Sequence, residues 1–339
     1  MIGRLLALFE PFILALLGTV LLATFLPARG QWAQVAAYAA GAGIVLLFFL
    51  HGAKLSRDAI WQGARNWRLH IATLGVTFAL FPLLGIGVHA LPFIPPEFAT
   101  GLLFLTLLPS TVQSSIAFTA IARGNVAAAV CAASFSNLIG IVLTPALVAL
   151  LMGGATGGVS WASVETILLQ LLVPFVLGHL LRPWIGGFVA RNKSWLTRVD
   201  RGSILLVVYS AFGAAVVEGL WHKVAPSSLL LLALLCLILL AIVLGITTLL
   251  GRLLHLPRED AIVLLFCGSK KSLASGVPMA GVLFAPAQVG IVLLPMMLFH
   301  QLQLIACALI APRLAARPSS SSSLNRHFHL KEENYHDRP

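Results

Sequence analysis

Ten apolar stretches, each about as long as a membrane crossing, follow one another along this chain. Neither Ile204–Val217 nor Leu229–Leu250 contains a charged residue. A transmembrane helix needs about 20 mostly apolar residues, and a water-soluble core of this size would still need a polar surface. Charged residues make up only 10% of the chain, whereas soluble domains have roughly 25%. The sequence therefore predicts an all-α integral membrane protein and argues against a water-soluble domain.

Windows bounded by Pro, Gly or charge place the ten predicted transmembrane helices at residues 9–26, 33–53, 69–91, 98–121, 125–152, 164–182, 203–220, 227–250, 261–284 and 288–311. With the N-terminus in the cytoplasm, 18 of the 22 Lys and Arg residues fall on the cytoplasmic side. Arg29 and Lys223 fall on the opposite side, and Lys270 and Lys271 lie inside a predicted helix. Basic residues collect in cytoplasmic loops. Both termini are therefore predicted to be cytoplasmic, in a multi-pass protein of the plasma membrane, taken to be a bacterial inner membrane.

The ten predicted helices divide into two sets of five, at residues 1–155 and 156–315. Because five is odd, the second set must enter the membrane from the other side, which predicts a 5+5 inverted repeat. The glycine-rich stretch Gly153–Gly158 is expected to link the halves. Residues 316–339, which are rich in serine at first and polar thereafter, are expected to form a disordered cytoplasmic tail.

The fourth helix of each half has an interrupted pattern. Pro109 lies within the polar stretch Leu107–Ser115, and Gly268, Gly276 and Pro278 accompany a second polar cluster. Pro removes a backbone donor and Gly tolerates unwound geometry, so both helices are expected to break and to hinge there. Paired interruptions of this kind indicate a transport site, although Ser and Thr also pack helices in membranes. The candidate binding residues here are Ser110, Thr111, Gln113, Ser114, Ser115, Ser269, Lys270, Lys271 and Ser272.

Lys270 and Lys271 are expected near mid-membrane, where the preference of basic residues for cytoplasmic loops does not explain them. A charge there costs at least about 2.5–3.5 kcal/mol and is by default functional. None of the 11 Asp and Glu residues is expected at that depth, and Asp200 is assigned to the loop before residues 203–220. The cavity is therefore predicted to be positive and to favour an anion. His300, Gln301 and Gln303 of the tenth helix complete the candidates, with hydrogen-bonded packing as the alternative role of His300.

Four stretches of this chain resemble the bile acid:sodium symporter superfamily, in particular its SBF-like branch. They are Pro109–Ser115, Ala122–Val126, Phe266–Pro278 and Leu298–Leu304. The resemblance implies that discontinuous helices 4 and 9 cross. It also implies a core domain of helices 3–5 and 8–10, and a panel domain of helices 1, 2, 6 and 7. Substrate would bind in the cleft between the two domains.

The same resemblance places the family's sodium ligands on residues of this chain. A Ser-Asn pair falls on Ser114-Ser115, a Gln falls on Thr77, and a Glu falls on Cys267. The hydroxyls of helix 5 fall on alanines, beside the further candidates Ser134, Ser136 and Asn137. Na⁺ is thus implied by the family, but its oxygen ligands are largely absent. No other cofactor or metal is expected.

The predicted function is secondary active transport of a small or amphipathic organic anion by alternating access. Coupling to protons, or independence from sodium, is favoured over sodium coupling. The alternative is a non-transporting regulator or sensor of ion homeostasis that keeps the fold. An enzyme is not expected, because no catalytic constellation or P-loop is present. The expected partners are an organic anion and the lipid bilayer, without nucleic acid, and the chain is expected to be a monomer or homodimer.

Overall fold

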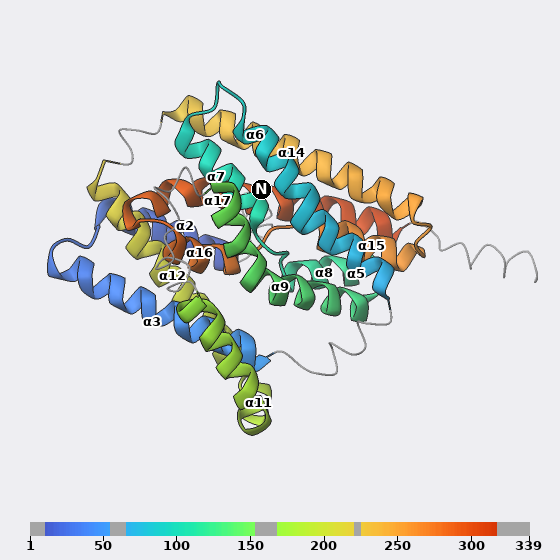
Figure 1. Ribbon diagram of the computed structural model, residues 1–339, viewed down its shortest axis with the longest axis horizontal. Coiled ribbons are helices and arrows are strands. Elements are labelled where there is room, and N and C mark those ends of the chain that lie inside the picture. The colour runs from blue at the N-terminus through green and yellow to red at the C-terminus, as the bar shows by residue number, and fades with distance from the viewer. Residues whose placement is uncertain (1–10, 55–65, 153–167, 220–224, 317–339) are drawn as a thin grey trace, which may run out of the picture.

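The computed structural model describes residues 11–54, 66–152, 168–219 and 225–316, and every regular element in those ranges is a helix (Figure 1). The elements are α2 (Pro11–Phe25), α3 (Gln31–Lys54), α5 (Trp67–Gly75), the π-helical turn η1 (Val76–Leu80), α6 (Phe81–His89), α7 (Pro96–Leu107), α8 (Gln113–Ile121), α9 (Val126–Met152), the π-helical turn η2 (Leu168–Leu172), α11 (Val173–Arg191), α12 (Lys193–Val217), α14 (Pro226–Leu253), α15 (Arg258–Gly268), α16 (Leu273–Leu283) and α17 (Pro286–Ala315). The predicted linker and the predicted tail beyond residue 316 lie outside the described residues.

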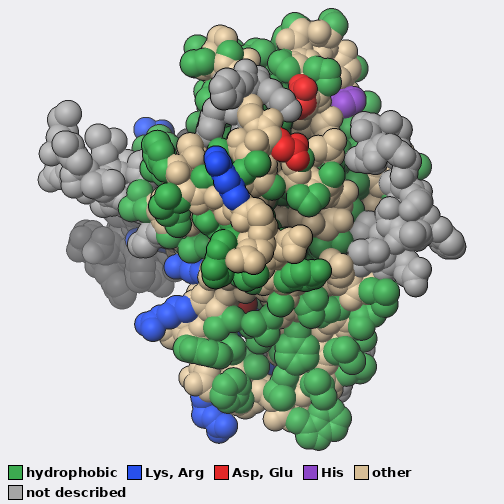
Figure 2. All heavy atoms as spheres, turned by 90° about the vertical axis from the view of Figure 1, so that its left-hand side faces the viewer, with side chains coloured by type: hydrophobic (Ala, Val, Ile, Leu, Met, Phe, Trp, Pro, Cys, Tyr) green, Lys and Arg blue, Asp and Glu red, His purple; other side chains and the backbone are tan. Residues whose placement is uncertain are grey.

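Seven helices in the described ranges are long and apolar enough to cross a membrane. Large apolar side chains such as Phe25, Tyr38 and Trp184 are more than three-quarters exposed. Hydrophobic side chains dominate the lower half of the face drawn in Figure 2, where Lys and Arg lie mainly toward one edge. Such a surface is stable against lipid tails and not against water, so the chain is a multi-pass membrane protein.

Both predicted helix breaks are present. In the range 98–121, α7 ends at Leu107 and α8 begins at Gln113; in the range 261–284, α15 ends at Gly268 and α16 begins at Leu273. An 11-residue helix such as α15 rises only about 16 Å, roughly half of the bilayer core. Each break therefore falls where two half-length helices meet.

Gly276 and Pro278 are not where the second helix breaks, because both lie inside α16. A Cβ atom on Gly276 would lie 2.4 Å from Sδ of Met296 and 2.5 Å from Cδ1 of Leu108. The glycine is needed for close packing rather than for unwinding.

Two predicted boundaries differ from the structure because an apolar window ends at the first charge, whereas a helix does not. The range 164–182 continues as α11 to Arg191, and the range 203–220 begins earlier, with α12 at Lys193. Asp200 consequently lies on a helix and not in a loop, which corrects the sequence-based assignment.

The helix that carries Thr77 contains a π-helical turn. The N–H of Phe81 bonds to the carbonyl of Val76, five residues back. The next residue, Pro82, has no N–H to offer to the carbonyl of Thr77. That carbonyl is left for a partner outside its own helix.

The helices gather around the breaks in two groups (Figure 1). In one group, α3 packs along α11 and α12, and α12 also packs on α2. In the other, α7 packs on α6 and α17, α8 packs on α9, α15 and α17, and α14 packs on α15 and α17. Contacts of α12 with α16 and α17 join the groups.

Candidate functional site

The unwound segment after α7 leaves five consecutive carbonyl groups, from Thr106 to Ser110, without helical partners. All five are satisfied by groups from other parts of the chain. Leu107 accepts from Oγ1 of Thr144 at 2.8 Å, and Pro109 accepts from the N–H of Ser272, also at 2.8 Å. Ser110 accepts from the amide of Asn137 at 2.9 Å. The carbonyls of Thr106 and Leu108 accept from Lys271. Buried backbone groups must be paired, so these contacts hold the break open.

The second unwound segment, Ser269–Ser272, is held against α17 and against the first break. The side-chain amide of Gln303 accepts from the N–H of Lys271 at 2.9 Å and donates to its carbonyl at 3.1 Å. From the first break, Oγ of Ser110 donates to the carbonyl of Cys267 at 2.5 Å, and Oγ of Ser115 donates to that of Phe266 at 3.0 Å. The two breaks are therefore cross-linked at the point where they meet.

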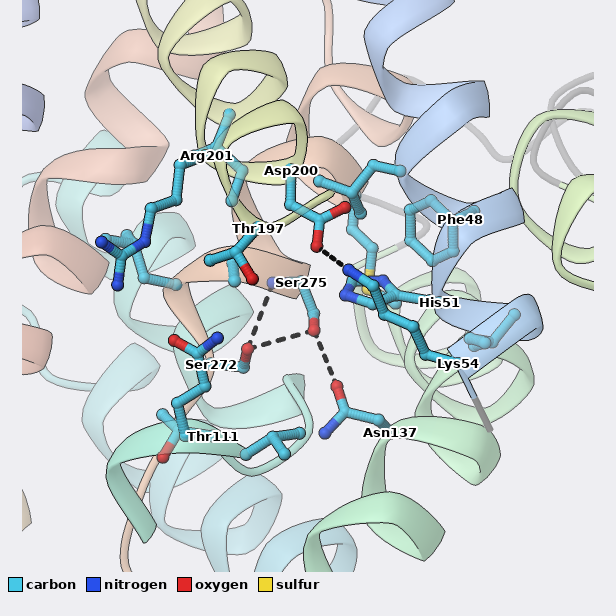
Figure 3. Close-up of a pocket in the computed structure, with 18 of the residues that line it drawn as sticks. Phe48, His51, Lys54, Thr111, Asn137, Thr197, Asp200, Arg201, Ser272 and Ser275 are labelled. Carbon is cyan, nitrogen blue, oxygen red and sulfur yellow. Dashed lines mark hydrogen bonds and ion pairs between the residues drawn. The ribbon is translucent and has the colours of Figure 1, made fainter. Parts of the chain in front are cut away.

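Asn137 on α9 joins the two breaks through one side chain. Its Nδ2 donates to the carbonyls of Ser110 and Ala133, each at 2.9 Å, and its Oδ1 accepts from Oγ of Ser275 at 2.8 Å. Oγ of Ser275 also accepts from Oγ of Ser272 at 3.0 Å. Figure 3 shows the hydrogen bonds that link Ser272, Ser275 and Asn137.

Lys271 is buried and fully partnered. Its Nζ donates to the carbonyls of Thr77 and Thr106 at 2.8 Å each and to that of Leu108 at 2.7 Å. The ring of Phe81 lies beside the ammonium, with its centroid 4.1 Å away. The ammonium thus uses all three of its protons on freed carbonyls and faces an aromatic ring on another side.

Lys270, its neighbour, has a different environment. Its Nζ is fully buried and has no hydrogen-bond partner among the residues described. The nitrogen lies 4.2 Å from the ring centroid of Phe118 on α8 and 5.3 Å from that of Phe266 on α15. Cation–π attraction to these rings is the interaction that the surroundings offer to its charge.

A cavity of about 310 Å³ opens beside the two breaks. One wall is formed by the starts of α8 and α16 together with α9 and His300; the other is formed by Phe12 of α2, Phe175 of α11, and faces of α3 and α12. The pocket therefore lies between the two helix groups.

Seven of the predicted binding residues line this cavity: Thr111, Gln113, Ser114, Ser134, Asn137, Ser272 and His300. Nine do not, and most of those are buried in the supporting network: Thr77, Ser110, Ser115, Ser136, Ser269, Lys270, Lys271, Gln301 and Gln303. Of the predicted hinges, Pro109 lies in the first break and Gly268 ends the helix before the second.

Sequence reasoning missed the charged side of the cavity. Lys54 of α3 and Asp200 of α12 form an ion pair there (Figure 3). His51 and Arg201 line the same side, and the guanidinium of Arg201 lies 5.3 Å from the ring centroid of Phe12. Sequence alone assigns Lys54 and Arg201 to the basic residues of the cytoplasmic side and Asp200 to a loop, and it does not single out His51. A helical spacing in the sequence could have indicated this side of the cavity. It places four residues on one helix face: Thr197, Asp200, Arg201 and Ile204.

Paired half-helices that meet beside a cavity, in a multi-pass helical protein, are typical of membrane transporters. The sequence pattern of the SBF-like CPA transporter family matches residues 10–316, and the chain belongs to that family. No group of three or more His, Cys, Asp or Glu side chains that could hold a metal ion occurs in the described part of the chain.

Three relatives illustrate the range of the similarity. The uncharacterized protein PA2026 of Pseudomonas aeruginosa is 56% identical over 318 residues, 93% of this chain and 95% of the relative. A protein of Escherichia coli named "Putative symporter YfeH" is 51% identical over 312 residues, 91% of this chain and 94% of the relative. Sodium/bile acid cotransporter 7 of Rattus norvegicus is 24% identical over 276 residues, 80% and 81% of the two chains.

Proposed function

We propose that this protein is a secondary active transporter of a small organic anion, which it binds in the cavity beside the two helix breaks. The observation that carries the proposal is that two half-helices begin at this cavity. Gln113 and Ser114 at the start of α8 line it, as do Leu273 and Ala274 at the start of α16. The first N–H groups of a helix have no partner within the helix, and the helix dipole makes that end positive. Two such ends at one cavity favour a negatively charged ligand.

The full charges on the cavity wall agree with an anionic substrate. Among the described lining residues these are Lys54, Asp200 and Arg201, which sum to one positive charge. Lys54 and Asp200 form an ion pair with each other. The described lining of the cavity is therefore positive overall.

Cavity size and wall chemistry narrow the substrate class. A volume of about 310 Å³ lies at the lower end of ordinary ligand pockets. Phe48, Phe175 and Met279 supply apolar surface to the cavity, and Ser134 and Asn137 supply a hydroxyl and an amide group. A compact acid with an apolar body and a hydrogen-bonding group fits this cavity better than a bulky steroid conjugate does.

The proposed transport cycle uses the two helix groups as moving parts. The group of α2, α3, η2, α11 and α12 would be the panel, and the group of α5–α9 and α14–α17 would be the core. If each broken pair counts as one crossing, α5, η1 and α6 as one, and η2 with α11 as one, there would be ten crossings in two inverted halves. Both termini would lie in the cytoplasm of a bacterial inner membrane. Support comes from the cavity between the groups and from the basic residues of the sequence.

Thiol labelling tests whether the cavity binds the anion. The four native cysteines are buried, so Ser134→Cys introduces a cavity thiol, and Ser136→Cys on the same helix is the matched buried control. Small aromatic and branched carboxylates are first screened by thermal shift. A stabilising acid is expected to slow the labelling of Ser134→Cys by an anionic thiol reagent, whereas Ser136→Cys should label poorly throughout.

Counterflow in proteoliposomes separates transport from sensing. A carrier exchanges labelled for unlabelled anion across the membrane, and this exchange is the expected result. If an anion stabilises and protects the protein but never exchanges, the chain is a sensor and the transport proposal is wrong.

A further inference from the structure

We propose that the ammonium of Lys271 is a tethered cation, which permanently fills the site that a soluble coupling cation would otherwise need. The inference rests on the proposed transport function for its consequences, but the site itself can be tested without transport. It concerns Lys271 and not its neighbour Lys270.

The first support is how the three carbonyl oxygens around Lys271 come to be available. The carbonyl of Thr77 receives no backbone hydrogen bond, because Pro82 has no N–H. The carbonyl of Thr106 would normally accept from the N–H of Ser110, but that N–H donates to Oγ of Ser136 at 2.9 Å. Leu108 lies beyond the end of α7, in the unwound segment. Two separate defects, a π-helical turn and a helix break, thus aim their carbonyls at one point.

The second support is the chemistry of that point. Unwound carbonyls and the carboxyl ends of half-helices carry partial negative charge, and broken-helix transporters use such groups to coordinate cations. Here the oxygens lie 2.7 to 2.8 Å from Nζ of Lys271, and Phe81 offers the face of its ring to the same ammonium. A cation site is therefore complete, and its cation is covalently part of the chain.

A tethered cation changes the energetics of transport, because no soluble cation enters or leaves this site during a cycle. A monovalent anion carried alone moves one negative charge across the membrane. An inside-negative potential then biases its distribution outward by about 50-fold per 100 mV. The protein is thus expected to export or exchange its anion, and a sodium gradient is not expected to drive accumulation.

Chemical rescue of stability tests the site directly. Lys271→Ala removes the ammonium and leaves three buried carbonyls without a donor, so in choline chloride its unfolding midpoint should fall by about 5 °C or more. Methylammonium, which reproduces the lysine head, should raise that midpoint progressively with concentration, as a ligand of the folded state does. Na⁺ is tested in parallel. Lys270→Ala is the matched control, equally buried but without carbonyl partners, and should show no cation-specific rescue.

Several outcomes overturn the proposal. The proposal fails if Lys271→Ala is as stable as the wild type. It also fails if the variant folds and neither methylammonium nor Na⁺ raises its unfolding midpoint more than choline does. If Lys271→Ala does not fold, counterflow by the wild-type protein still tests the proposal. Counterflow that is equal in Na⁺ and choline, with efflux accelerated by an inside-negative potential, supports the tethered cation. Counterflow that requires Na⁺ refutes it. If no anion exchanges under any condition, the transport proposal fails, and the rescue experiment alone judges the site.

Discussion

Replacing either of two glycines by alanine should weaken the contact between α3 and α11, which carry part of the cavity wall. A Cβ atom on Gly52 would lie 1.9 Å from the carbonyl oxygen of Phe175, and one on Gly178 would lie 2.0 Å from that of Phe49. Small residues let membrane helices approach closely without a hydrophobic driving force. Here each glycine meets the backbone of the opposite helix, which cannot rotate out of the way as a side chain can.

The size of the effect follows from the geometry. Real Cβ contacts essentially never fall below 3.0 Å, so Gly52→Ala must open its 1.9 Å contact by at least 1.1 Å. Overpacking costs about 1–3 kcal/mol, and a backbone clash favours the upper end. Alanine regains roughly 0.5–1 kcal/mol of helix propensity. The net loss is about 2 kcal/mol, which lowers the unfolding midpoint of a 339-residue chain by about 3 °C.

Thermal unfolding in detergent, with Gly41→Ala as the control, measures this effect. Gly41 is on the same helix, and nothing lies within 4 Å of the position of its added Cβ. The control should therefore match or slightly exceed the wild type, whereas Gly52→Ala and Gly178→Ala should both fall below it. Because α3 carries Phe48 and Lys54 on the cavity wall, the two variants should also lose anion affinity. A Gly52→Ala midpoint at or above that of Gly41→Ala would refute the close backbone contact.

Three further substitutions test the site. Asn137→Ala removes the side chain that joins the two breaks and should cost about 1–3 kcal/mol, seen as a lower unfolding midpoint; an unchanged midpoint would contradict the joining role. Arg201→Gln should weaken anion binding in a thermal-shift titration, whereas Arg198→Gln, exposed on the same helix, should not; equal effects would remove Arg201 from the site. Lys270→Met should raise the unfolding midpoint by about 2–4 °C, because it removes a buried charge without a hydrogen-bond partner among the described residues; a lower midpoint would show that the rings satisfy the ammonium.

The helix breaks were predictable because their causes are local. Pro109 cannot donate a hydrogen bond, and the polar residues around it cannot all face lipid, so sequence alone places the first break within a few residues. The cluster after Gly268 gives the second in the same way. By contrast, Gly276 and Pro278 carry the same local signal but lie inside α16. Whether such a residue breaks a helix or only packs closely depends on neighbours such as Met296 that are distant in sequence.

The side of the cavity formed by α3 and α12 was not predictable by counting charges. Lys54, Asp200 and Arg201 lie near the ends of apolar windows, where basic residues ordinarily report topology. Their role depends on α12 beginning well before its apolar part and on which face it turns toward α3. That face can be recognised in the sequence only once the bounds of α12 are known, because helical spacing places residues on one face only where the chain is a helix.

The two adjacent lysines show where local reasoning ends, because residue type, depth and burial are alike for both. A charge at this depth costs at least about 2.5–3.5 kcal/mol. For Lys271, hydrogen bonds from a charged donor contribute about 1.5–3 kcal/mol each, and three of them exceed that cost. For Lys270, a desolvated cation–π contact supplies about 2 kcal/mol, which does not clearly meet it. Packing of the fold accounts for Lys271 and leaves Lys270 unexplained by stability. Lys270 is therefore the lysine whose charge the stability of the fold does not require.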